Sequence, residues 1–191
     1  DRYDAFKYHI QRSDMSRYAI LHTYGGIYMD LDYRLRVPLD TVTKHLADTY
    51  PRGNVFVNRT PNGIRTMSLS NSFMIARVPG EAFWEAVLRS ISRVRGNGPG
   101  LSRYTQIMRS TGPEKVSGVA RSFNASADVE RQVIGLETAQ FNPCSACARG
   151  SSCAKGNGVM AVHENAGSWK TTTGRMYMHV YCQRRTYFVV V

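Results

Sequence analysis

The sequence lacks any long apolar run. None of its hydrophobic stretches approaches the ~20 residues that a membrane-spanning helix needs. The opening residues DRYDAFKYHI contain no apolar segment of the kind found in secretory leaders. Neither a membrane-spanning helix nor a secretory leader is therefore predicted within these 191 residues.

Acidic residues are also scarce. The 25 lysines and arginines outnumber the 14 aspartates and glutamates, which gives a formal net charge of +11. The basic residues form no run of five or more and no interleaved aromatic platform, which argues against a nucleic-acid binder. The charge instead favours an anionic partner such as a nucleotide sugar or a phospholipid surface, or else reflects a generally basic surface.

What the sequence does contain is the pattern of one α/β domain over residues 1–191. Its 42% hydrophobic and 20% charged residues are ordinary for a globular protein, and its length suits a single domain. Helices and strands are expected to alternate. Helices are predicted at 13–23, 39–47, 79–95, 101–108 and, followed by a polar loop, within 114–128; strands are predicted at 27–32, 53–57, 71–77, 133–136, 158–163 and within 175–191.

The stretch 13–40 carries the clearest chemical signal. Gly25 and Gly26 interrupt a helix, and Asp30 and Asp32 follow two apart on a short strand. Side chains alternate along a strand at ~3.3 Å per residue, so the two carboxylates are predicted to share one face with their backbones roughly 7 Å apart. Such a pair suits a hard divalent cation, Mn²⁺ or Mg²⁺, which keeps positions open for substrate phosphates.

The same pattern assigns faces to the neighbouring side chains. Ser13 is predicted to cap the helix, and the predicted buried stripe consists of Met15, Tyr18, Ala19 and His22. Asp14 and Arg17 lie one turn apart beside that stripe, where they either act together or form an ordinary surface ion pair. In the strand, the residues predicted to face the core are Ile27, Met29 and Leu31.

The whole run resembles the signature of the DXD-containing sugar transferases. These include the yeast initiating α-1,6-mannosyltransferase, the inositolphosphoceramide mannosyltransferases and the α-1,4-galactosyltransferases, and more distantly the glucosyltransferase domains of clostridial toxins. The family pattern is approximately (A/S)D-xx-RY-xx-L-xx-YGG-x-Y-x-D-x-D. This sequence matches it at Ser13, Asp14, Arg17, Tyr18, Leu21, Tyr24, Gly25, Gly26, Tyr28, Asp30 and Asp32.

The resemblance implies a GT-A type α/β fold and a function. It implies metal-dependent transfer of a hexose, such as mannose or galactose, from a nucleotide-sugar donor to a glycan or glycolipid hydroxyl with retention of configuration. A non-catalytic carbohydrate- or nucleotide-binding domain of the same fold remains the alternative. Nucleic acid is not an expected partner.

The resemblance also implies the roles of individual residues. Asp32 is expected to bind the metal, and Asp30 to contact the metal, its water shell or the ribose. His163 is expected to be the third metal ligand, because His163 to Trp169 resembles the family's closing H-x₄-S-W. The expected catalytic residues are Asp14, Arg17, Asp30 and Asp32, and the expected substrate-binding residues are Asp14, Arg17, Tyr28, Asn71, Thr111, Gly112, Ser168 and Trp169.

The position of the motif within the chain leads to further expectations. By resemblance, the first nucleotide-binding strand and any membrane anchor precede residue 1, and the domain faces the lumen of the Golgi or another secretory compartment. The four cysteines are Cys144, Cys147, Cys153 and Cys182. The first three could bind zinc, although a zinc ribbon needs a second close pair and Cys182 stands alone. If the domain lies in an oxidising lumen, as the resemblance implies, two disulfides are favoured over zinc. Residues 144–158 are read as an insertion loop, and Asn58 and Asn124 as glycosylation acceptors.

Overall fold

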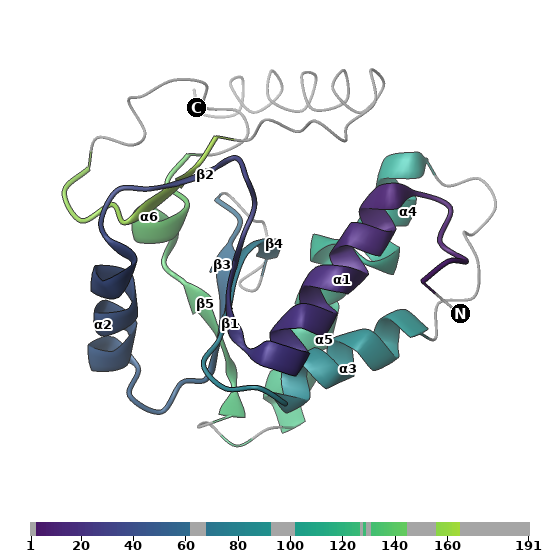
Figure 1. The fold of residues 1–191 in the computed structure, drawn as a ribbon, viewed down its shortest axis with the longest axis horizontal. Coiled ribbons are helices and arrows are strands. Elements are labelled where there is room, and N and C mark those ends of the chain that lie inside the picture. The colour runs from purple at the N-terminus through teal and green to yellow at the C-terminus, as the bar shows by residue number, and fades with distance from the viewer. Residues whose placement is uncertain are drawn as a thin grey trace, which may run out of the picture.

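A computed structural model of the chain describes residues 3–61, 68–92, 102–126, 128, 131–144 and 156–164 (Figure 1). The predicted mixed α/β architecture is confirmed. Helices lie on both faces of a central sheet, so that the described part of the chain has three layers.

Four strands form the central sheet among the described residues, in the order β1-β4-β3-β5. They are β1 (Gly26–Met29), β4 (Leu69–Ala76), β3 (Val55–Arg59) and β5 (Val133–Leu136). Strand β4 is antiparallel to both neighbours, and β5 is parallel to β3. A second sheet pairs β2 (Tyr33–Leu35) with β6 (Ala161–His163) in antiparallel fashion. Strand β6, the last strand among the described residues, is thereby brought next to the D-x-D segment.

The two faces of the central sheet bury separate apolar clusters. On one face lie α1 (His9–Tyr24), α3 (Ala82–Ser92), α4 (Arg103–Ser110) and α5 (Pro113–Ser126), with Tyr18 and Trp84 in the cluster. On the other lie α2 (Leu39–Thr49) and α6 (Thr138–Phe141), with Phe73 and Phe141 in the cluster. Alternation along β3 separates the two, because Val57 faces the first cluster and Phe56 the second.

Helix α1 begins earlier than predicted and buries a different face. It starts at His9, so Ser13 lies inside the helix and does not cap it. The Tyr8 backbone N–H instead donates to Gln11 Oε1 at 3.2 Å. The buried residues are Gln11, Asp14, Arg17, Tyr18 and Leu21. Of the predicted stripe, Tyr18 is buried and Met15 packs half-buried against the same cluster, whereas Ala19 and His22 are only half-buried. Three polar side chains are buried instead, because each finds a hydrogen-bond or charge partner on a neighbouring segment.

The D-x-D segment is a turn and not part of a strand. Strand β1 ends at Met29, and the Tyr33 N–H donates to the Asp30 carbonyl at 2.9 Å. Alternation of faces stops where the strand stops. Leu31 at the tip of the turn is fully exposed and Met29 is exposed, so their predicted core positions were wrong. Ile27, which lies inside the strand, does pack against the core.

Most other element boundaries shift by a few residues. Strand β5 has its predicted bounds, whereas β3 begins and ends two residues later than predicted, and β4 begins two residues earlier and ends one residue earlier. The predicted end of the 79–95 helix and the strands within 175–191 fall outside the described residues. Within the described ranges, no helix is both long and apolar enough to cross a membrane.

Two expectations for modified residues meet different outcomes. Asn58 is fully buried inside the sheet, so it cannot accept a glycan in the folded chain, and that prediction was wrong. Cys144 packs beside Val159 and Val162 and is not a free thiol. The remaining cysteines lie outside the described residues, and their pairing stays a prediction.

Candidate active site

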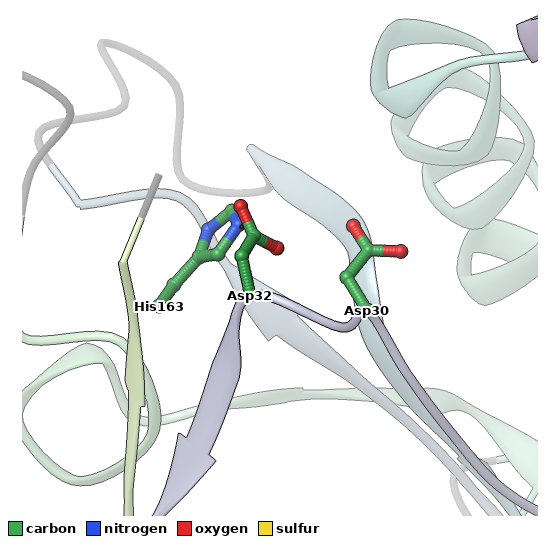
Figure 2. Close-up of side chains that lie close together, drawn as sticks. All are labelled: Asp30, Asp32 and His163. Carbon is green, nitrogen blue, oxygen red and sulfur yellow. Dashed lines mark ion pairs between the residues drawn. The ribbon is translucent and has the colours of Figure 1, made fainter. Parts of the chain in front are cut away.

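Three side chains from distant parts of the chain meet at one end of the sheet (Figure 2). Asp30 and Asp32 come from the turn after β1, and His163 ends β6. One potential ligand atom from each lies within 4.8 Å of the others. His163 Nε2 is 3.2 Å from Asp32 Oδ1. All three side chains are partly exposed, so the group is open to solvent.

The chemistry of these donors fits a divalent cation. Two carboxylates and one imidazole provide oxygen and nitrogen ligands, a set that suits Mn²⁺ and leaves further coordination positions open. Asp30 Oδ1 already accepts hydrogen bonds from Arg17 and Tyr28, which leaves Oδ2 as its free ligand atom. The structure therefore brings together the three residues that the sequence nominated as ligands.

Arg17 joins the carboxylate group to helix α1. Its Nη1 donates to Asp30 Oδ1 at 2.9 Å and to the Asn71 carbonyl at 3.0 Å. The guanidinium lies 4.5 Å from the centre of the Tyr28 ring, and the Tyr28 hydroxyl donates to the same Asp30 oxygen at 2.7 Å. Arg17 is only 6% exposed. Asp30 is thus held from two sides in one orientation.

Asp14 lies below Arg17 and is more deeply buried. Its Oδ1 accepts from Asn71 Nδ2 at 2.8 Å and lies 3.5 Å from Arg17, while Oδ2 accepts from the Thr111 hydroxyl at 2.9 Å. Loss of hydration raises the pKa of this carboxyl to about 6, although the attraction of Arg17 and the two hydrogen bonds act in the opposite direction. The alternative of an ordinary surface ion pair between Asp14 and Arg17 is excluded by their burial.

Several residues expected to touch substrate lie one layer beneath the site. Asp14 is 3% exposed with both oxygens engaged, Asn71 donates to Asp14 and to the Tyr18 hydroxyl, and Thr111 is fully buried. Gly112 is buried in the turn between α4 and α5. Three of them hold Arg17 and α1 in place: Asp14 pairs with Arg17, Asn71 bonds Asp14 and Tyr18, and Thr111 donates to Asp14. Contact of these four residues with a substrate stays a prediction. Ser168 and Trp169 lie outside the described residues.

Two residues beside the site were not nominated from the sequence. Tyr33 stacks between Phe73 and His163, with ring centres 5.4 Å and 5.0 Å away. Its hydroxyl accepts from Asn58 Nδ2 at 3.1 Å. The only sequence signal was the position of Tyr33 directly after the D-x-D, and Asn58 was considered solely as a glycosylation acceptor.

Comparison with known proteins shows which class of protein carries this arrangement of residues. Residues 1–48 match the family model described as glycosyltransferase sugar-binding region containing DXD motif. This match covers α1, the glycines and both aspartates of the site. The resemblance to DXD-containing sugar transferases that the sequence predicted is therefore confirmed.

Individual proteins of known name are also similar to this chain. The chain is 35% identical over 130 residues to inositol phosphoceramide mannosyltransferase 3 of Schizosaccharomyces pombe, which covers 68% of this chain and 32% of that protein. It is 35% identical over 124 residues to the mannosyl phosphorylinositol ceramide synthase CSH1 of Saccharomyces cerevisiae, covering 64% and 29%. The chain thus spans about a third of the length of the curated relatives it matches.

Proposed function

We propose that this chain forms the catalytic site of a metal-dependent retaining glycosyltransferase. The enzyme would transfer a hexose, such as mannose or galactose, from a nucleotide sugar to a hydroxyl of a glycan or glycolipid. The observation that carries the proposal is the group of Asp30, Asp32 and His163 beside Arg17, in a region that matches the DXD sugar-binding model. The names of the relatives favour mannose as the sugar and a phosphorylated ceramide lipid as the acceptor.

Each residue of the group has a distinct proposed role. Asp32, His163 and Oδ2 of Asp30 would hold Mn²⁺ or Mg²⁺. A cation bound there would supply charge neutralisation as the nucleotide diphosphate leaves. Arg17 and Tyr28 orient the Asp30 carboxylate, and Arg17 adds positive charge at the same end of the sheet. Asp14, with Asn71 and Thr111, would fix Arg17 from below.

The proposed setting follows from the same relatives. A glycolipid acceptor places the reaction at a membrane surface, and the net charge of +11 suits an anionic surface and an anionic donor. We propose a lumenal position in the Golgi or another secretory compartment, with membrane association through a segment outside these residues. Burial of Asn58 removes one of the two acceptor motifs that agreed with this location.

The direct test is hydrolysis and transfer of a panel of nucleotide sugars by the purified protein, with Mn²⁺ and with a chelator. We expect turnover of at least one donor that requires the cation. Asp32→Asn should lower it by ~100-fold or more, because one metal ligand is lost. Asp48→Asn is the matched control, since Asp48 is an exposed carboxylate on α2 that pairs only with Lys44 in the described contacts.

The outcomes separate the two functional classes. Donor binding without any hydrolysis or transfer would favour the non-catalytic binding domain. Turnover that is equal with and without the cation, or that survives Asp32→Asn, would contradict the metal-dependent mechanism.

A further inference from the structure

The candidate site is assembled from two parts of the structure. Asp30 directly follows β1 of the central sheet, where its backbone N–H donates to the Ser72 carbonyl at 2.8 Å and Arg17 holds its side chain. Asp32 directly precedes β2 and His163 ends β6, so both depend on the small β2–β6 sheet, which has three residue pairs among the described residues. The ligand atoms can keep their spacing only if the small sheet is fixed on the large one.

Tyr33 provides that attachment. It is the buried residue of β2, whose other two positions are exposed or half-buried, and it pairs directly opposite His163. Its hydroxyl donates to the Phe141 carbonyl at 2.8 Å and accepts from Asn58 Nδ2 at 3.1 Å. Asn58 is itself fixed in the central sheet, because its Oδ1 accepts from the Phe73 N–H at 3.1 Å.

The Tyr33 ring also sets the plane of the imidazole. The ring centres of Tyr33 and His163 are 5.0 Å apart, and the two ring planes are inclined by only 13°. The Phe73 ring also stacks on the Tyr33 ring, with 5.4 Å between their centres. A histidine binds a metal along the direction of one ring nitrogen, so its affinity depends on the orientation of the ring. His163 Nε2 points at the carboxylate of Asp32, 3.2 Å away.

We propose that Tyr33, anchored by Asn58, is the positioning residue for His163 and sets the metal affinity of the site. This inference rests on the metal group of the proposed function but assigns a role to a residue outside it. The Tyr33 hydroxyl is engaged by Phe141 and Asn58, so Tyr33 acts by holding the third ligand at the right angle and distance and not as a ligand itself. Loss of such support around a ligating histidine typically weakens metal affinity by ~10–100-fold.

The test measures Mn²⁺ affinity directly, by electron paramagnetic resonance of the free ion, and does not rely on turnover. Tyr33→Leu should weaken Mn²⁺ binding by ~10–100-fold, whereas Tyr33→Phe keeps the ring stack and should lose less than ~10-fold. Tyr50→Leu is the matched control. Tyr50 is an aromatic of the same apolar cluster that packs on Phe56 at 5.9 Å, and its loss should leave Mn²⁺ affinity unchanged.

A double-mutant cycle with His163→Ala distinguishes positioning from general damage. If Tyr33 acts through His163, Tyr33→Leu should change the Mn²⁺ affinity little once the imidazole is absent. Equal losses in both backgrounds, or no loss in Tyr33→Leu and Tyr33→Phe, would overturn the inference. Should Tyr33→Leu fail to fold, the same cycle is run with Tyr33→Phe. Absence of Mn²⁺ binding by the parent protein would instead overturn the metal site itself.

Discussion

At Asp14 the chain buries a carboxylate beneath its site, with hydrogen bonds from Asn71 and Thr111 and a positive charge 3.5 Å away. Burial still dominates, so the pKa of this carboxyl lies near 6 and not near its ordinary value of 3.8. At neutral pH the folded protein therefore carries an ionised group that opposes folding. The presence of a buried carboxylate at this position is better explained by its hold on Arg17 than by a contribution to stability.

The first prediction concerns the pH dependence of stability. Below pH ~4 Asp14 is protonated in both the folded and the unfolded chain; between pH ~4 and ~6 the unfolded chain loses its proton first, so stability falls as pH rises. The loss should approach about 3 kcal/mol above pH ~6, because each factor of ten in proton affinity corresponds to ~1.4 kcal/mol. Urea unfolding at several pH values should show Asp14→Asn free of this decline. Parallel curves for the parent and this variant would contradict the assignment.

The second prediction concerns Arg17. Its guanidinium donates at once to Asp30 and to the Asn71 carbonyl, and lies over the Tyr28 ring. A lysine cannot reproduce this planar arrangement of donors, so Arg17→Lys should lower kcat/KM for the donor by ~10–100-fold. Arg34→Lys is the matched control, because Arg34 pairs with Glu164 at the surface. Steady-state kinetics provide the measurement. Equal losses of kcat/KM in Arg17→Lys and Arg34→Lys would contradict a specific role for Arg17.

At the scale of single residues, the most informative signal was the resemblance to the DXD-containing sugar transferases. Aspartates at 30 and 32 and a histidine at 163 could be nominated as ligands, and the structure brings them together. The burial of Asp14 and Thr111 could not be predicted, because burial depends on what packs around a side chain in the folded chain. The stack of Tyr33 on His163 depends on pairing between strands far apart in sequence, which a local pattern does not contain.

Two adjacent glycines, Gly25 and Gly26, join helix α1 to strand β1, and their surroundings differ. Gly25 ends α1 with φ of +67°, and a side chain there would meet the Ala76 carbonyl oxygen at 3.1 Å and backbone atoms of residues 78 and 79. Gly26 has φ of +90°, but nothing lies within 4 Å of the position of its missing Cβ. Both positions need a backbone conformation that glycine adopts freely.

The third prediction separates these two effects. Gly26→Ala carries only the conformational penalty, about 1–2 kcal/mol, whereas Gly25→Ala adds a clash with backbone and should cost about 1 kcal/mol more. Chemical unfolding of the two variants checks the order. Gly26→Ala is the control for Gly25→Ala, and equal losses would mean that the backbone near Ala76 yields without cost.

Element types were easier to predict from the sequence than element ends. The glycine pair correctly placed the end of α1, and β5 was located to the residue. The start of α1 was missed because its first turn is polar and gives no apolar pattern. This turn is stabilised by a distant residue on α4, since Gln11 Nε2 donates to Ser110 Oγ at 2.7 Å. The D-x-D was placed on a strand, since alternating residues continue past the point where β1 leaves β4.

In the molecule as a whole, the order of strands could not be predicted. Period and propensity indicate where a strand lies, but pairing of β1 with β4 and of β2 with β6 is decided by tertiary packing. Only the resemblance linked the two ends of the chain at one site. The description of residues 1–191 as one domain stays a prediction.

The fourth prediction follows from this long-range closure. A cation bound by Asp30, Asp32 and His163 would tie the central sheet to the small sheet, so it should bind the folded chain far better than the unfolded one. At 100 times its dissociation constant it would add ~2.7 kcal/mol, or roughly 5–10 °C in Tm for a chain of this size. Thermal unfolding with Mn²⁺ and with a chelator checks this. Asp32→Ala should abolish the shift, and a shift retained in that variant would place the cation elsewhere.

The late position of His163 in the chain also fixes an order of events during synthesis. The two aspartates leave the ribosome long before β6 does, and Tyr33 cannot dock fully until Phe141, whose carbonyl accepts its hydroxyl, has emerged. A growing chain therefore displays the carboxylates without their imidazole partner. Under the proposed function, cation binding therefore depends on residues made late, and chains that stop before β6 should bind Mn²⁺ more weakly than chains that include it.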